Sequence, residues 1–107
     1  MNYEWDIEKY RKNLKKHKVT FEQAVLAIED PCSLFIFDER HSREEDRYIV
    51  IGEAEGVVLF VNEIEIDENT IRIISARLAK THEKEAYHEN CSLFFGKRTE
   101  THKKRLG

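Results

Sequence analysis

Apolar residues near the N-terminus recur at the spacing of a short helix. Ile7, Tyr10 and Leu14 stand at i, i+3 and i+7, directly after Asp6, a residue type that often caps helix N-termini. The pattern predicts a helix that ends at residue 17 or 18, where clustered cations favour the negative end of the helix dipole.

A second helix is expected after a very tight connection. Thr20 and Gln23 have the spacing of a capping box, and Pro31 ends the helical pattern. Between them one apolar face repeats at helical spacing, formed by Phe21, Ala24, Val25 and Ile28. The sequence therefore predicts two antiparallel N-terminal helices.

From residue 33 the apolar pattern becomes extended. Apolar runs occupy residues 33–38, 48–51, 57–61 and 71–76, and turns or polar loops separate them. Because these connections are local, we expect a three- to four-stranded antiparallel sheet with the two helices packed on one face. The predicted fold class is α+β.

The C-terminal part begins with a third predicted helix. Thr81 is expected to cap this helix, which has acidic residues in its first turn and closes near Asn90. The remaining residues carry one apolar cluster and then a basic stretch without periodicity. We expect residues 1–90 to form one domain and residues 91–107 a C-terminal extension, mobile beyond Gly96 unless a partner holds it.

Composition narrows the class of protein. With 107 residues, 40% hydrophobic and 36% charged, the chain has the profile of one globular domain. It contains no apolar stretch of the roughly 20 residues that a membrane helix needs, and its N-terminus lacks a signal-peptide core. We therefore expect a cytoplasmic protein that does not contact membranes. Cys32 and Cys91 have no metal-ligand or CxxC spacing and are expected to be reduced structural thiols.

The net charge of -3 hides a segregation along the chain. Residues 9–18 carry a local charge of +6, residues 19–71 a charge of -11, and the part from residue 72 onward a charge of +5. This pattern suits a phosphate backbone on one surface and a basic partner on another, although solvated charged faces would give the same pattern.

Three stretches in order resemble the BrnT family of toxins. The first is EWDIEKYRKNLKKHKVTFEQA near the N-terminus; the second combines the pair Asp30 and Pro31 with the loop DERHSREEDR; the third is IRIISARLAKTHEKEAY. Together they span residues 3 to about 89, and the tail after residue 90 has no counterpart. The family usually has Gly where Lys18 stands, Thr where Ile64 stands and Arg where Ile66 stands.

The resemblance implies a RelE-like ribonuclease fold and inhibition of translation through RNA cleavage. It also implies neutralisation by a ribbon-helix-helix antitoxin of the BrnA type, which represses the shared operon, so that the toxin meets operator DNA only through the antitoxin. If the missing Arg contacts RNA in relatives, the present chain would cleave more slowly or with different selectivity.

Metal-independent RNA cleavage needs proton carriers near neutral pH and cations that stabilise a pentacovalent phosphorane, so histidine and arginine are the natural candidates. No cofactor or metal ligand set is visible, and no Gly-rich phosphate loop, HExxH or GxSxG motif occurs. The predicted catalytic residues are Arg77, Arg47, His17 and His41, and the predicted RNA-binding residues are Lys16, Arg72 and Lys80.

Several candidates also have a structural explanation. His17 suits the negative end of a helix dipole, and Arg47 can pair with the acids that precede it. Trp5 and Tyr87 could stack on RNA bases, but aromatic residues beside helix stripes usually belong to a core. Arg77 has no obvious packing reason. Since Arg72 and Arg77 are an odd number of residues apart, they share a site only if the strand ends before Arg77, which we expect.

Two functions from different classes remain. The leading hypothesis is an endoribonuclease that is the toxin of a type II toxin-antitoxin system. The alternative is a catalytically weak or inactive binding subunit that acts as corepressor with a DNA-binding antitoxin. Direct DNA binding is disfavoured because no helix-turn-helix spacing with a basic recognition helix is visible.

Overall fold

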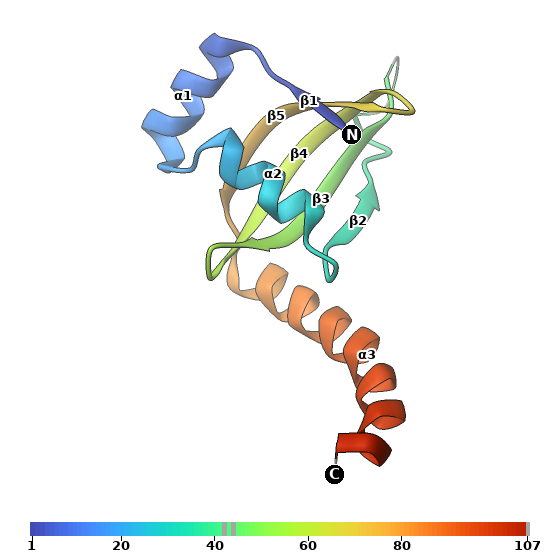
Figure 1. The fold of residues 1–107 in the computed structure, drawn as a ribbon. Coiled ribbons are helices and arrows are strands. Elements are labelled where there is room, and N and C mark those ends of the chain that lie inside the picture. The colour runs from blue at the N-terminus through green and yellow to red at the C-terminus, as the bar shows by residue number, and fades with distance from the viewer. Residues whose placement is uncertain (42, 44, 107) are drawn as a thin grey trace.

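A computed structural model describes residues 1–41, 43 and 45–106, with side chains up to residue 93. It contains a five-stranded mixed sheet with helices on both faces (Figure 1). In chain order the elements are β1 (Asn2–Glu4), α1 (Ile7–His17), α2 (Phe21–Glu29), β2 (Leu34–Phe37), β3 (Arg47–Ala54), β4 (Val57–Asp67), β5 (Thr70–Leu78) and α3 (Thr81–Leu106).

The two N-terminal helices begin and end where the sequence predicts. The Asp6 carboxylate accepts the amides of Glu8 and Lys9, and Thr20 forms a reciprocal capping box with Gln23. At the end of α1, Lys18 adopts φ 59°, the left-handed region that glycine enters without steric cost. This conformation explains why glycine suits the position in the BrnT pattern.

The sheet differs from the prediction in strand number and direction. Its order is β1-β5-β4-β3-β2, and β2 to β5 pair antiparallel as expected. However, β1 adds a fifth strand that runs parallel to β5, with Tyr3 beside Ile71. Three residues are too short to show a strand period, so the sequence pattern did not reveal β1.

One face of the sheet, called the α2 face, packs against α2. Its buried residues include Val50 on β3, Leu59 on β4 and Ile73 on β5. The contact is close, because a Cβ added at Gly52 would lie 2.0 Å from the carbonyl oxygen of Ala27 in α2. Glycine at this position therefore lets the helix backbone approach β3.

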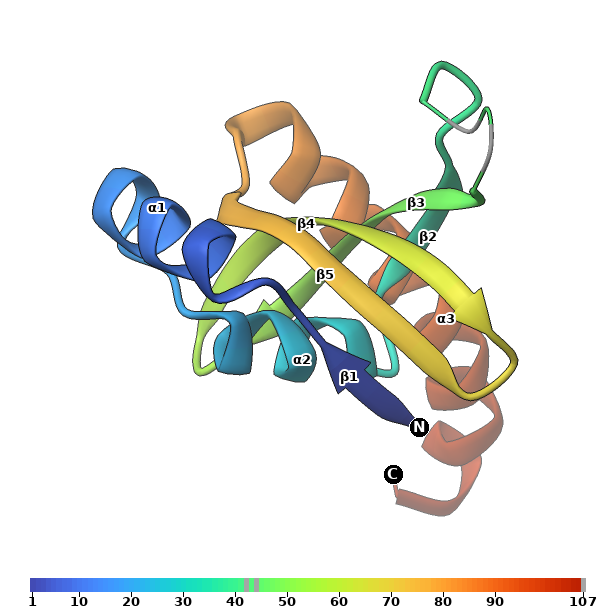
Figure 2. The same ribbon diagram turned by 90° about the horizontal axis from the view of Figure 1, so that it is seen from above.

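The opposite face, called the α3 face, packs against the first half of α3 (Figure 2). Ile51 and Val58 form a second core cluster there with Tyr87. The sequence pattern predicted the two N-terminal helices on one face and gave the third helix no position, so α3 as a second layer is a finding of the structure. The helix also runs on to Leu106 instead of closing near Asn90.

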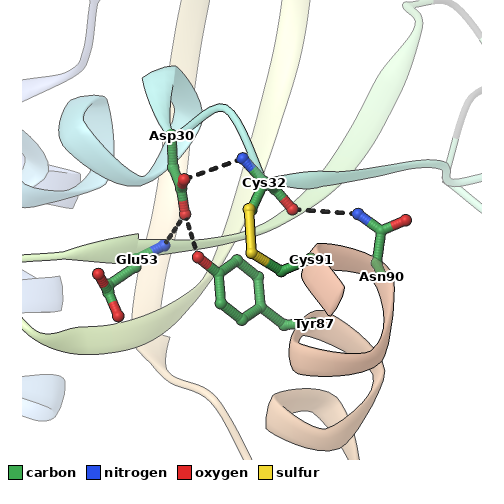
Figure 3. The surroundings of a disulfide bond; sticks show 6 residues. All are labelled: Asp30, Cys32, Glu53, Tyr87, Asn90 and Cys91. Carbon is green, nitrogen blue, oxygen red and sulfur yellow. Dashed lines mark hydrogen bonds between the residues drawn. A yellow bond between two sulfur atoms is a disulfide. The ribbon is translucent and has the colours of Figure 1, made fainter. Parts of the chain in front are cut away.

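Three links tie α3 to the connection between α2 and β2 (Figure 3). The Tyr87 hydroxyl donates to Asp30, the side-chain amide of Asn90 donates to the Cys32 carbonyl oxygen at 3.1 Å, and Cys32 forms a disulfide with Cys91. The prediction of reduced cysteines is thus wrong for this structure. Separated by 59 positions, the two residues show no pairing signal in the sequence, and α3 brings them together.

Helix α1 covers the part of β5 that β1 leaves open. The side-chain amide of Asn13 donates to the Ala76 carbonyl oxygen at 2.8 Å, and the Ala76 amide donates back at 3.0 Å. Asn13 is buried, and its side-chain amide makes the backbone hydrogen bonds that a neighbouring strand would make at this edge.

Within the described residues, no helix is long and apolar enough to cross a membrane.

Candidate nucleic-acid interface

A β-bulge gathers three predicted arginines on the α3 face. Asn62 pairs with Ser75 and Glu63 with Ile73, so Ile74 is an extra residue in β5. The extra residue shifts the alternation, and Arg72 and Arg77 therefore lie on the same face. The expectation that the strand ends before Arg77 is wrong, because β5 continues to Leu78.

Arg47 lies on this face as well, in one row with Arg72. Both residues pair with Ile64 of β4, which is buried between them. Close to this row, Ile66 is the extra residue of a second bulge and is 39% exposed. The position at which the family usually has Arg is therefore next to the arginine row.

Arg77 is held more tightly than the sequence suggested. Its two terminal nitrogens donate to the two carboxylate oxygens of Glu83, both at 2.9 Å, and its guanidinium lies 4.0 Å from the ring centroid of Phe60. Burial raises the pKa of Glu83, but the hydrogen bonds from Arg77 and Lys80 outweigh it and lower that pKa overall. Arg77 thus has a clear packing reason, contrary to our expectation.

Arg72 is engaged with β1. Its side chain contacts the Glu4 carboxylate at 2.7 Å, and both side chains are more than 40% exposed. An exposed pair of this kind is weak, so Arg72 can exchange Glu4 for a phosphate at little cost.

The loop after β2 brings His41 and Arg47 together. Both residues line an open cavity of about 480 Å³ with Arg40, Arg43 and Glu45. The His41 ring nitrogen Nδ1 lies 2.8 Å from the Asp38 carboxylate, and this contact chiefly lowers the pKa of Asp38. A carboxylate on one nitrogen orients the ring and leaves Nε2 for proton exchange.

Lys16 and His17 lie in a different place, a cleft of about 310 Å³ between α1 and the bulge of β5. Lys9 and Lys12 also line it, next to Ile74 and Ser75. Among the described residues, none of these four cations forms an ion pair. Lys9 and Lys12 were not among the predicted RNA-binding residues, although their i, i+3, i+7 spacing with Lys16 indicates one helix face.

The remaining candidates are scattered. Lys80 is exposed just before α3, and its backbone amide donates a hydrogen bond to the Glu83 carboxylate. Trp5 packs edge-to-face against Phe21, and Tyr87 is buried, so both aromatic residues belong to the core. Ser42 of the loop motif lies outside the described residues. Within the described part of the chain, no three metal-ligating side chains gather.

Comparison with protein families decides the identity of this domain. The family described as the ribonuclease toxin BrnT of type II toxin-antitoxin systems matches residues 5–83, about three quarters of the chain. The chain belongs to the BrnT family. The matched span covers every strand from β2 to β5, both N-terminal helices and the first turn of α3.

A solved BrnT structure agrees with this fold. The Brucella abortus ribonuclease toxin BrnT superposes with a TM-score of 0.59 at 21% identity, covering 76% of this chain and 99% of its own. About a quarter of the present chain therefore has no counterpart in that toxin. A search of curated proteins gives no match.

Proposed function

We propose that this BrnT-family chain is a metal-independent endoribonuclease whose reaction centre is the loop cavity with His41 and Arg47. The observation that carries the proposal is that His41, which contacts the Asp38 carboxylate, lines the same cavity as Arg47. An oriented imidazole can transfer the protons of RNA cleavage, and a guanidinium can stabilise the phosphorane. Family membership adds the ribonuclease description and the type II system.

In the proposed reaction, His41 takes the proton from a ribose 2'-hydroxyl. The resulting oxygen attacks the adjacent phosphorus, and the guanidinium of Arg47 stabilises the negative charge of the phosphorane. The protonated imidazole then returns its proton to the departing 5'-oxygen. The products are a 2',3'-cyclic phosphate and a 5'-hydroxyl, so no metal or cofactor is needed.

The rest of the RNA is proposed to lie over the α3 face and the α1 cleft. Arg72 lies in the same strand row as Arg47, and Lys16 and His17 extend the positive surface past Ser75. Cations of this kind hold phosphates without reading sequence. This placement allows a chain with net charge -3 to bind RNA.

The test is cleavage of a labelled RNA by the purified toxin in the presence of EDTA. We expect His41→Ala to lower kcat about 100- to 10,000-fold and Arg47→Ala about 100- to 1,000-fold. Arg11→Ala is the matched control, because Arg11 is an exposed cation that pairs with Glu8 outside both cavities. Full activity of both cavity variants would overturn the proposed reaction centre.

One observation favours the alternative, an inactive corepressor. Arg72 and Arg77 are both paired with carboxylates, and Ile66 replaces the usual arginine near Arg72. A tight complex with the antitoxin, together with uncut RNA from the freed wild-type toxin, would establish this second function.

We further propose a ribbon-helix-helix antitoxin as the partner, as the family resemblance implies, with translation inhibited by the RNA cleavage. We place the toxin domain in residues 1–90 and treat residues 91–107 as an extension, because the family match ends at residue 83. Expression with and without the neighbouring antitoxin gene, followed by growth measurement, tests the toxic activity and its neutralisation by the antitoxin.

A further inference from the structure

The outer edge of β2 is open in the described part of the chain. This strand is the last of the sheet, at the side where Figure 1 shows no further element beside it. The Asp38 amide donates to the Arg47 carbonyl oxygen on β3. Because backbone groups alternate sides along an antiparallel strand, Phe35 and Phe37 direct their amide and carbonyl groups away from β3. These groups can pair with an added strand.

The side chains of β2 are unusually apolar for an open edge. Phe35, Ile36 and Phe37 are 50%, 44% and 45% exposed, and β2 contains no charged residue or proline to block pairing. Phe37 packs edge-to-face against Tyr48 of β3, with ring centroids 5.5 Å apart. We call Phe35, Phe37 and Tyr48, which share the α2 face, the aromatic patch; an exposed apolar surface of this kind indicates a binding site.

Negative charge surrounds the aromatic patch. The pKa of Tyr48 is raised, foremost by Glu65, and further by burial, Asp46 and Glu63. Glu65 and Glu63 lie on the α2 face of β4, and neither α2 nor β2 contains a Lys or Arg. A partner segment that docks here is therefore favoured if it carries cations.

We propose that the open edge of β2 and the aromatic patch bind an extended antitoxin segment as a sixth strand, in which apolar side chains alternate with basic ones. The apolar side chains would cover Phe35 and Phe37, and the basic ones would lie near Asp46 and Glu65. The inference rests on the antitoxin partner that type II membership implies. It leaves the arginines of the α3 face outside the docking site.

The test compares two substitutions of Phe35 in binding to the antitoxin encoded beside the toxin gene. Phe35→Ala removes the ring but keeps the outward amide, whereas Phe35→Pro also removes that amide without loss of a bond to β3. By calorimetry we expect Kd to rise about tenfold for Phe35→Ala and about 100-fold for Phe35→Pro. Val57→Ala, an exposed apolar residue at the β3–β4 turn, is the control and should leave Kd unchanged.

A charge variant tests the docking site without a change in β2. The double variant Asp46→Lys, Glu65→Lys should weaken binding at least tenfold at low salt, and circular dichroism should show an unchanged fold. Unchanged Kd in this variant overturns the charge argument. Equal Kd for Phe35→Ala and Phe35→Pro, once both are shown to be folded, overturns strand pairing.

Two further measurements separate this inference from its rivals. If the toxin alone sediments as a dimer that Phe35→Pro dissociates while antitoxin affinity stays constant, a second copy occupies the edge and the proposal fails. RNA cleavage by the freed Phe35 variants should equal that of wild type. If the freed wild type does not cleave RNA but its antitoxin binding still depends on β2, the proposed ribonuclease function is contradicted and the docking proposal stands.

Discussion

The two faces of the sheet differ in charge. All three strand arginines, Arg47, Arg72 and Arg77, lie on the α3 face, together with the carboxylates of Glu4, which pairs with Arg72, and Glu53. The α2 face carries Glu63 and Glu65 and no strand arginine. The linear sequence shows only that a basic run, an acidic run and another basic run follow one another. The fold therefore separates charges by the alternation of strand residues and not by segments.

This separation explains how one small domain can serve two partners of opposite charge. A phosphate chain on the α3 face and a basic protein segment on the α2 face would each meet favourable potentials. The helices differ accordingly: α2 contains no cation, and α3 contributes Glu83, which fixes Arg77. Substitutions on one face should therefore leave the partner of the other face unaffected.

The largest expected effect on stability concerns the disulfide that holds α3 to its face. A link between residues 59 positions apart is expected to stabilise the fold by about 4 kcal/mol through the lost entropy of the unfolded chain. Cys32→Ser with Cys91→Ser should therefore lower the urea midpoint strongly. The wild type in reductant should behave as the double variant does, and the double variant should not respond to reductant.

Equal stability of the wild type with and without reductant would contradict the link. If the double variant stays folded, the α2 face should retain antitoxin binding, because the three contacts of α3 involve Asp30 and Cys32 before β2 and no residue of the aromatic patch.

Local signals in the sequence predicted the two N-terminal helices well. Asp6 and the Thr20–Gln23 box are complete caps within four residues, and the apolar runs 57–61 and 71–76 fall inside β4 and β5, which extend beyond them. Features that depend on pairing between distant segments left no local pattern in the sequence and were not predicted. Neither β1 nor the pairing of Cys32 with Cys91 can be inferred from neighbours in the chain.

The candidate site was predictable in part for the same reason. Residue type identified Arg47 and His41, and their common cavity supports that choice without testing it. The position of Arg77 on the same face as Arg72 depends on one extra residue, Ile74, that the alternation rule does not predict. The partner of Arg77 was also missed, because Glu83 has the sequence position of an ordinary acid in a first helical turn.

The next effect concerns the α2 face, where Glu63 is fully buried and neither carboxylate oxygen has a hydrogen-bond partner among the described residues. Burial, aided by Glu65, raises the pKa of Glu63 to about 7. The unfolded chain ionises this group near its ordinary value of 4.5, so the folded state loses stability as the pH rises from about 4.5 to 7. The loss amounts to about 3 kcal/mol.

Glu63→Met removes the charge and keeps the length of the side chain. Urea unfolding should show the variant more stable than wild type by about 3 kcal/mol at pH 8, with a much smaller difference at pH 4.5. Glu68→Gln serves as the control, because Glu68 is exposed in the turn between β4 and β5 and does not contribute to the raised pKa of Glu63. A difference that is constant with pH would show that the Glu63 carboxyl does not titrate between these values.

The smallest expected effect tests whether Arg77 belongs to the fold or to the reaction. Because Glu83 is largely buried, Arg77→Ala leaves a carboxylate without its partner and should cost about 2 kcal/mol of unfolding free energy, less than a fully buried pair would. The double variant Arg77→Ala, Glu83→Ala should recover part of that loss in urea unfolding. Cleavage of RNA is measured for both variants. If Arg77→Ala loses cleavage and the double variant regains it, Arg77 is a positioning residue of the α3 face. If the double variant is folded but inactive, Arg77 acts on RNA directly.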